Sequence, residues 1–125
     1  MEKIIADTNF FIDLFRFKIH DTDFSKIRIT KSVYDELKSM SSKKTKESVY
    51  AKLALRMIKE KNVKILKSIK NKADDDLLEY SKKGYAIATN DRELRKRIKA
   101  FGGKTIYLRS KKKLAIGWLF ISYTT

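Results

Sequence analysis

Acidic side chains occur in short clusters in a chain that is otherwise strongly basic. The 125 residues include 30 Lys and Arg against 15 Asp and Glu, a formal net charge of +15. Cysteine is absent and the only histidine is His20, which excludes thiolate sites, cysteine nucleophiles and multi-histidine sites. Ligand sets made of oxygen alone favour hard cations such as Mg²⁺ or Mn²⁺. Two such ions can activate a water and stabilise the leaving oxygen of a phosphodiester. The acids of interest are Asp7, Glu36, Asp74, Asp75, Asp76 and Asp91.

The hydrophobic pattern places these acids relative to predicted strands and helices. Short apolar runs typical of buried strands alternate with helical patterns, which predicts a parallel sheet with helices on its faces. In such sheets ligands bind beyond the carboxyl ends of the strands. Asp7 directly follows the first run and Asp91 follows the fourth, so neighbouring first and fourth strands would bring carboxylates together at one edge. Their repulsion would then require a proton or a cation. The runs are residues 3–6, 27–29, 63–66, 85–88 and 105–108.

Each acid also has a purely structural interpretation. Aspartate is a favoured helix N-cap, and Asp7 and Asp91 stand where N-caps belong. Glu36 could be a solvated helix residue, and the run from Asp74 to Asp76 could be an acidic first turn stabilised by the helix dipole. The sequence leaves both interpretations open for every one of these acids.

Local signals predict two further helix starts and one helix end. Ser32 with Asp35, and Asn90 with Glu93, have the spacing of a capping box, so we expect Ser32 and Asn90 to be N-caps. The pair at 102–103, Gly-Gly, is expected to end the last helix.

The basic residues are concentrated toward the C-terminus. From Arg92 onward there are ten basic residues and one acid, Glu93. A surface of this charge attracts polyanions, chiefly nucleic acid, although solubility or an anionic membrane surface would also explain it. The loop at 41–46 is a second basic segment, interpreted either as an ordinary solvated connection or as an RNA contact. We expect RNA phosphate contacts from Arg95, Lys96, Arg97, Lys99, Lys111, Lys112 and Lys113.

Length and composition predict one domain without a membrane span. A chain of 125 residues has no room for a second core, and 42% of it is hydrophobic. No apolar segment approaches the roughly 18 residues that a membrane helix needs, and the first apolar run is too short for a signal peptide, so we expect a cytoplasmic protein. The single domain should span 1–125, with a core at about 3–108 and a basic, then apolar, tail at 109–125 that packs on the body or forms a subunit contact. Tyr34, Tyr50 and Phe101 have the spacing of core residues rather than of base-stacking platforms.

Four motifs, in order, resemble those of PIN-domain nucleases. Residues 5–10, Ile-Ala-Asp-Thr-Asn-Phe, resemble the opening Asp-Thr-Asn motif, and residues 32–37, Ser-Val-Tyr-Asp-Glu-Leu, resemble the second. Residues 73–75, Ala-Asp-Asp, resemble the third, and residues 88–94, Ala-Thr-Asn-Asp-Arg-Glu-Leu, the fourth. The resemblance covers nearly the whole chain, from about residue 3 to about residue 108.

The resemblance implies a three-layer α/β/α, Rossmann-like PIN fold. Its five-stranded parallel sheet would have the order 3-2-1-4-5, with the first and fourth strands side by side. Asp76 stands where relatives often carry a small or apolar residue, and we expect it to face solvent. The implied catalytic and metal-binding acids are Asp7, Glu36, Asp74 and Asp91, with Asp75 as a further candidate ligand; Thr8, Asn9, Thr89 and Asn90 would orient carboxylates or waters.

The implied activity is that of an endoribonuclease that uses Mg²⁺ or Mn²⁺ to hydrolyse RNA phosphodiester bonds. The short single domain favours a VapC-type toxin of a toxin–antitoxin system, which would have a small antitoxin protein as partner and could form a homodimer. The alternatives are a nuclease that processes precursor rRNA, a non-catalytic RNA-binding PIN module, and a basic ribosome-associated structural protein. The last of these explains the charge but not the acids.

Overall fold

In the part of the chain that the computed structural model describes, residues 3–18 and 23–108, five parallel strands form one sheet. The strand order is β3-β2-β1-β4-β5, as the resemblance implies. The pairing of Ala6 with Ala88 joins the last residues of β1 and β4, so both strands end at the same level of the sheet. The strands are β1 (Ile4–Ala6), β2 (Ile27–Thr30), β3 (Lys64–Leu66), β4 (Ala86–Ala88) and β5 (Thr105–Ile106).

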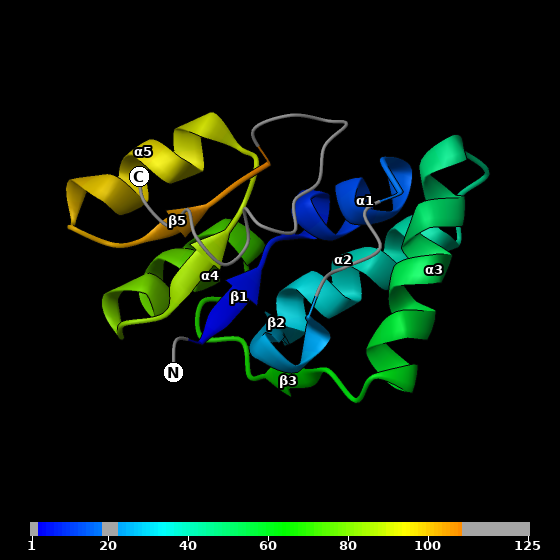
Figure 1. Ribbon diagram of the computed structural model, residues 1–125, viewed down its shortest axis with the longest axis horizontal. Coiled ribbons are helices and arrows are strands. Elements are labelled where there is room, and N and C mark those ends of the chain that lie inside the picture. The colour runs from blue at the N-terminus through cyan, green and yellow to red at the C-terminus, as the bar shows by residue number, and fades with distance from the viewer. Residues whose placement is uncertain (1–2, 19–22, 109–125) are drawn as a thin grey trace.

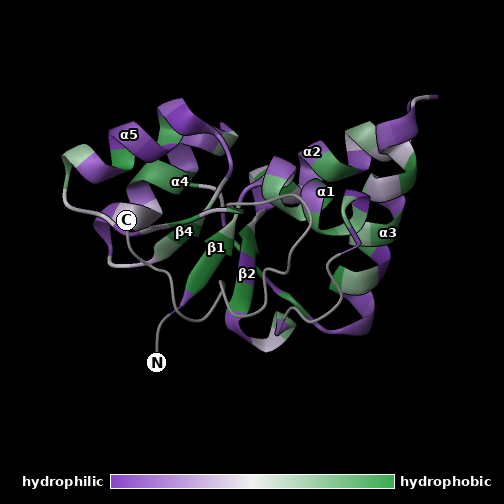
Figure 2. Cartoon of the chain, turned by 45° about the horizontal axis from the view of Figure 1, so that its top comes forward, coloured by the Kyte–Doolittle hydropathy of each residue, from purple (hydrophilic) through white to green (hydrophobic). Residues whose placement is uncertain are grey.

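Helices cover both faces of the sheet, with α1, α2 and α3 on one side and α4 and α5 on the other (Figure 1). Consecutive strand residues point to opposite faces, so Ile4 and Ala6 pack with the first group while Ile5 packs with the second. Figure 2 shows hydrophobic residues on β1, β2 and β4 at the centre and hydrophilic ones along much of α5. None of the described helices is long and apolar enough to cross a bilayer. The helices are α1 (Thr8–Arg16), α2 (Lys31–Ser41), α3 (Lys46–Glu60), α4 (Ala73–Lys82) and α5 (Arg92–Ala100), with a short 3-10 turn at Phe24–Lys26.

Packing of α1 fixes the position of the residue that joins it to β1. Phe10, Phe11 and Leu14 lie on α1 and are at most 1% exposed. Burial of each such side chain contributes roughly 1.5–3 kcal/mol. Since α1 begins at Thr8, immediately after β1 and Asp7, these contacts hold Asp7 at the carboxyl end of the sheet.

One helix N-cap differs from the predicted residue, and the structure decides between two predicted candidates for another. Thr30, rather than Ser32, caps α2, and its hydroxyl oxygen accepts a hydrogen bond from the Val33 N–H at 3.2 Å. Asp91, rather than Asn90, caps α5. An N-cap needs an extended backbone just before the helix. Because β2 runs directly into α2, Thr30 has that conformation, whereas Ser32 already lies inside the first helical turn.

Asp76 was expected to face solvent, and this prediction is wrong. The residue is fully buried. Its carboxylate accepts hydrogen bonds from the hydroxyls of Ser32 and Ser68 and from the backbone N–H groups of Ile69 and Lys70, at 2.5–2.8 Å. Burial opposes ionisation, but these four hydrogen bonds outweigh it and lower the pKa of Asp76. The carboxylate therefore ties α2 and the segment after β3 to the start of α4.

The aromatic residues expected in the core are only partly there. Tyr34 and Tyr50 are half-buried against the α1–α3 side of the core, but Phe101 is 52% exposed. Phe101 is the C-cap of α5, and Gly102 ends that helix with a φ of +81°, as predicted for the glycine pair. His20 and the tail at 109–125 lie outside the described residues.

Replacing Asp76 with Asn should lower the free energy of unfolding by about 2–3 kcal/mol, because an amide nitrogen would face groups that now donate to a carboxylate. Urea unfolding near neutral pH measures this. The lowered folded-state pKa means that the Asp76 contribution is present above the unfolded-state pKa and is lost as pH falls through the folded-state value. The two proteins should therefore become equally stable in acid.

The matched control is Asp35→Asn, which changes an exposed carboxylate on α2 that pairs with Lys31. Its effect should stay below about 1 kcal/mol. Equal stability of the Asp76 and Asp35 variants near neutral pH would show that the buried carboxylate does not hold these segments together.

Candidate active site

Asp7 is the most buried of the candidate acids. It follows β1, is 5% exposed and caps α1, with Oδ1 accepting the Thr8 N–H at 2.8 Å. Oδ2 accepts a hydrogen bond from the Thr89 hydroxyl, also at 2.8 Å. Burial raises the pKa of Asp7 to about 6, against these two hydrogen bonds, and the charges of Asp74 and Glu36 raise it further. The site therefore holds a carboxylate that is costly to ionise.

The pairing of β1 with β4 places the segment that carries Asp91 beside Asp7. The Asp7 N–H donates to the Ala88 carbonyl oxygen at 2.8 Å, which extends the ladder by one residue and places Thr89 beside Asp7. The Thr89 oxygen that donates to Asp7 also accepts the Asp91 N–H at 3.1 Å. One threonine hydroxyl thus connects the two aspartates that follow β1 and β4.

Asp91 is the N-cap of α5, as Asp7 is of α1, but it accepts N–H groups further into its helix. Its Oδ1 accepts the N–H groups of Glu93 at 2.9 Å and of Leu94 at 3.2 Å. The structural interpretation of both aspartates is therefore correct. It does not exclude a second role, because a capping carboxylate has two oxygens with about four lone-pair sites.

Helices α2 and α4 supply the other two acids. The Thr8 hydroxyl donates a hydrogen bond to Oε1 of Glu36, which lies exposed on α2. Asp74 lies in the first turn of α4. Burial raises the pKa of Asp74, the charges of Asp91 and Glu36 raise it further, and Arg97 opposes them. Asp74 is thus within electrostatic reach of Asp7, Glu36 and Asp91.

Asp75, the further candidate ligand, points toward α5. Its Oδ1 lies 3.9 Å from Nη2 of Arg97, and its charge also raises the pKa of Asp74. It therefore lies at the border between the four acids and the basic surface of α5.

The donor set fits a hard divalent cation by its chemistry. Carboxylate oxygens are the ligands that Mg²⁺ and Mn²⁺ prefer, and a cation would relieve the mutual repulsion that raises the pKa values of Asp7 and Asp74. Within residues 3–18 and 23–108, no three acidic or histidine side chains are already positioned as a group that could hold an ion. Binding would therefore require side-chain rotation of at least the exposed acids.

The four predicted supporting residues have different surroundings. Thr8 donates a hydrogen bond to Glu36, and Thr89 donates one to Asp7. Asn9 is exposed on α1. The Asn90 amide donates to Oδ2 of Asp13 at 2.8 Å, and its Oδ1 accepts the Leu108 N–H at 2.9 Å. Asn90 therefore contacts α1 and the segment after β5.

Sequence reasoning missed two residues at the border of the site. Asp13 accepts the Asn90 amide and pairs with Arg16 at 3.5 Å. Asp13 is the only acid in the mostly apolar α1, and that position could have indicated it from the sequence. Ser32 donates to Asp76 and so connects the helix that carries Glu36 to the helix that carries Asp74. No local pattern marks that contact, because 44 residues separate the pair.

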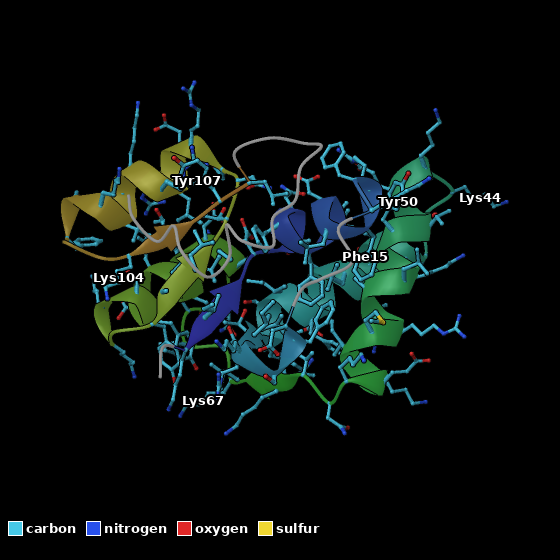
Figure 3. The ribbon with its side chains drawn as sticks, viewed as in Figure 1. Phe15, Lys44, Tyr50, Lys67, Lys104 and Tyr107 are labelled. Atoms are coloured by element: carbon cyan, nitrogen blue, oxygen red, sulfur yellow. The ribbon has the colours of Figure 1, made fainter. Side chains whose placement is uncertain are left out.

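The basic residues predicted to bind RNA lie in part on α5. Lys96, Arg97 and Lys99 are exposed, whereas Arg95 is half-buried with its guanidinium 4.1 Å from the centre of the Tyr107 ring. Figure 3 shows Tyr107 at α5, and Lys44 at the opposite end of the molecule on the α2–α3 connection. The two basic segments are therefore separate surfaces. The predicted contacts at 111–113 lie outside the described residues.

Comparison with known proteins agrees with this geometry. Residues 3–111 match the family model described as a PIN-like domain. Ribonuclease VapC4 of Methanocaldococcus jannaschii is 33% identical over 130 residues, covering 93% of this chain and 97% of the relative. Since the family match includes the strands, the helices and the four acids described above, the chain belongs to the PIN-like domain family.

Proposed function

We propose that the protein is a VapC-type endoribonuclease that hydrolyses RNA phosphodiester bonds with Mg²⁺ or Mn²⁺. The observation that carries this proposal is the group of acids at the carboxyl ends of β1 and β4, in which burial and neighbouring charge raise the pKa values of Asp7 and Asp74. The mutual repulsion of these carboxylates suits the site to a cation, and the basic surface of the protein suits it to an anionic substrate. The similarity to a protein named ribonuclease VapC4 supports the same activity.

In this mechanism Asp7, Glu36, Asp74 and Asp91 would hold the cation, and Asp75 is a further candidate ligand. A bound divalent ion supplies charge stabilisation and a more acidic water. The Thr89 hydroxyl fixes Oδ2 of Asp7, and the Thr8 hydroxyl orients Glu36. Burial of Asp7 against β4 keeps water away from one side of the site. The exposed cations on α5 bind the RNA backbone and hold a phosphate close to the acids.

A toxin role is favoured over processing of precursor rRNA by the name of the relative, with which the match covers 93% of this chain and 97% of the relative. We accordingly propose a small antitoxin protein as a natural partner, with a homodimer as the candidate assembly. The alternative of a non-catalytic RNA-binding module is disfavoured, because capping of α1 by Asp7 does not require Glu36 and Asp74 nearby, whose charges raise its pKa.

Asp7→Asn should reduce RNA cleavage in Mn²⁺ by at least about 100-fold, because it removes a charged ligand. The variant should stay folded and should still bind RNA, since the cations of α5 are unchanged. Its thermal midpoint should no longer rise when Mn²⁺ is added, because that rise requires a site. Labelled-RNA cleavage and thermal unfolding measure both effects, with Asp35→Asn as the control. Full activity of the Asp7 variant would show that Asp7 serves only as a helix cap.

The raised pKa of Asp7 predicts how stability depends on pH in the metal-free protein. A carboxyl whose folded-state pKa is raised to about 6 binds its proton more tightly in the folded state. Stability should therefore fall as pH rises from about 4 to about 6, the interval between the unfolded and folded values. Thermal unfolding in a chelator should show a smaller fall for Asp7→Asn. Identical pH profiles would mean that Asp7 is ionised without cost.

RNA affinity should decrease with salt, because cations displace condensed counterions from phosphates. Changing Arg95, Lys96, Arg97 and Lys99 together to Ala should make the slope of log affinity against log salt less negative, by roughly 0.7 for each phosphate that the variant no longer neutralises. The control changes Lys43, Lys44 and Lys46 to Ala at the opposite end of the molecule. A change of slope found only in the control variant would show that RNA binds at the α2–α3 connection instead.

A further inference from the structure

A hollow of about 320 Å³ lies between α4 and α5. Leu78 and Phe101 provide its apolar lining, and Lys70, Lys82 and Arg97 provide its basic groups. Two acids, Asp75 and Glu79, also line it, so its charged groups sum to a net positive charge. The hollow therefore combines an aromatic ring with cations, which is the combination that binds single-stranded nucleic acid.

Arg97 connects this hollow to the candidate active site. Its guanidinium lines the hollow, lies 3.9 Å from Asp75 and opposes the charges that raise the pKa of Asp74. Asp74 and Asp75 are consecutive residues of the first turn of α4, one facing the other acids and one lining the hollow. A polymer bound across the acids would therefore pass directly from them to the hollow.

Phe101 is the unusual residue of the hollow. It is 52% exposed at the end of α5, among the most exposed of the large apolar side chains in the described residues. The Lys82 ammonium lies 4.8 Å from the centre of its ring. At an exposed position a cation–π contact is weaker than a stacked base. A nucleobase can therefore replace the ammonium on the ring, and the ammonium can move to a phosphate.

We propose that this hollow is a subsite for one unpaired nucleobase of RNA, stacked on Phe101 with its phosphate near Arg97 and Lys70. The inference rests on the proposed ribonuclease function and adds to it a residue that binds a base of the substrate. Bases in a duplex are stacked on one another and cannot lie against a protein ring. The subsite therefore selects single-stranded RNA, with any base, since every base has a face that stacks.

The test measures binding of an unstructured, end-labelled oligoadenylate RNA to the full-length chain by fluorescence anisotropy. All variants carry Asp7→Asn so that the RNA stays intact. Phe101→Ala should weaken binding roughly 5- to 100-fold. Phe101→Leu, which keeps an apolar side chain without a ring face, should weaken it similarly, and Phe101→Trp should restore it. The control is Val49→Ala, which removes a 55% exposed apolar side chain on α3 and should leave affinity unchanged.

Two further measurements separate stacking from other effects of the ring. Replacement of Phe101 should leave the salt slope unchanged, because the ring touches no phosphate. The Phe101→Ala variant should bind a duplex RNA as strongly as the protein with Phe101. An equal loss of affinity for duplex and single strand, or normal affinity of Phe101→Leu, would overturn the subsite. A change of oligomeric state in solution caused by Phe101→Ala would overturn it too, because it would show that the ring contacts another protein chain.

The same experiment distinguishes failure of the subsite from failure of the proposed function. RNA bound tightly and equally with Phe101 or Ala would refute the subsite and leave the ribonuclease proposal intact. A protein with Phe101 in place that binds no RNA would refute both.

Discussion

The parallel pairing of β1 with β4 is the constraint on which the rest of the site depends. It extends one residue beyond the strands, through the Asp7 N–H and the Ala88 carbonyl, and so brings Thr89 against Asp7. A register shift of one residue would turn Asp7 toward the other face of the sheet. The apolar residues of β1 oppose such a shift, because Ile4 and Ile5 belong to different hydrophobic clusters on opposite faces.

The fold buries an acidic side chain, Asp7, beside other acids, where ionisation of its carboxyl group is unfavourable. Burial alone raises the pKa of Asp7, and the nearby acids add to this. Hydrogen bonds from Thr8 and Thr89 recover part of the cost and leave the carboxylate with a fixed orientation. The capping of α1 by Asp7 and of α5 by Asp91 contributes to the helices as well. The same two carboxylates therefore stabilise helices and form part of the acid group, so the structural and functional interpretations are compatible.

The sequence predicted the strands and helices, because these depend on local signals. Apolar runs marked the strands; Asp7 follows β1 directly, and Asp91 follows β4 after Thr89 and Asn90. The neighbouring position of β1 and β4 came from family resemblance and not from any pattern of residues. Contacts between distant residues were not predictable: Asp76 was expected in solvent, but donors from Ser32 and from the segment after β3 surround it. Phe101 had core spacing, but its place at the last turn of α5 leaves it exposed, since the chain reverses at Gly102.

The proposed function requires that the carboxylates gathered at the ends of β1 and β4 bind a divalent cation together. Anomalous X-ray diffraction from crystals of the protein grown with Mn²⁺ tests it most directly. We expect a manganese peak about 2.0–2.6 Å from carboxylate oxygens of Asp7 and of at least one of Asp74 and Asp91. Manganese bound only elsewhere, or a hydrogen-bonded Asp7 with no ion near it at saturating Mn²⁺, would contradict it.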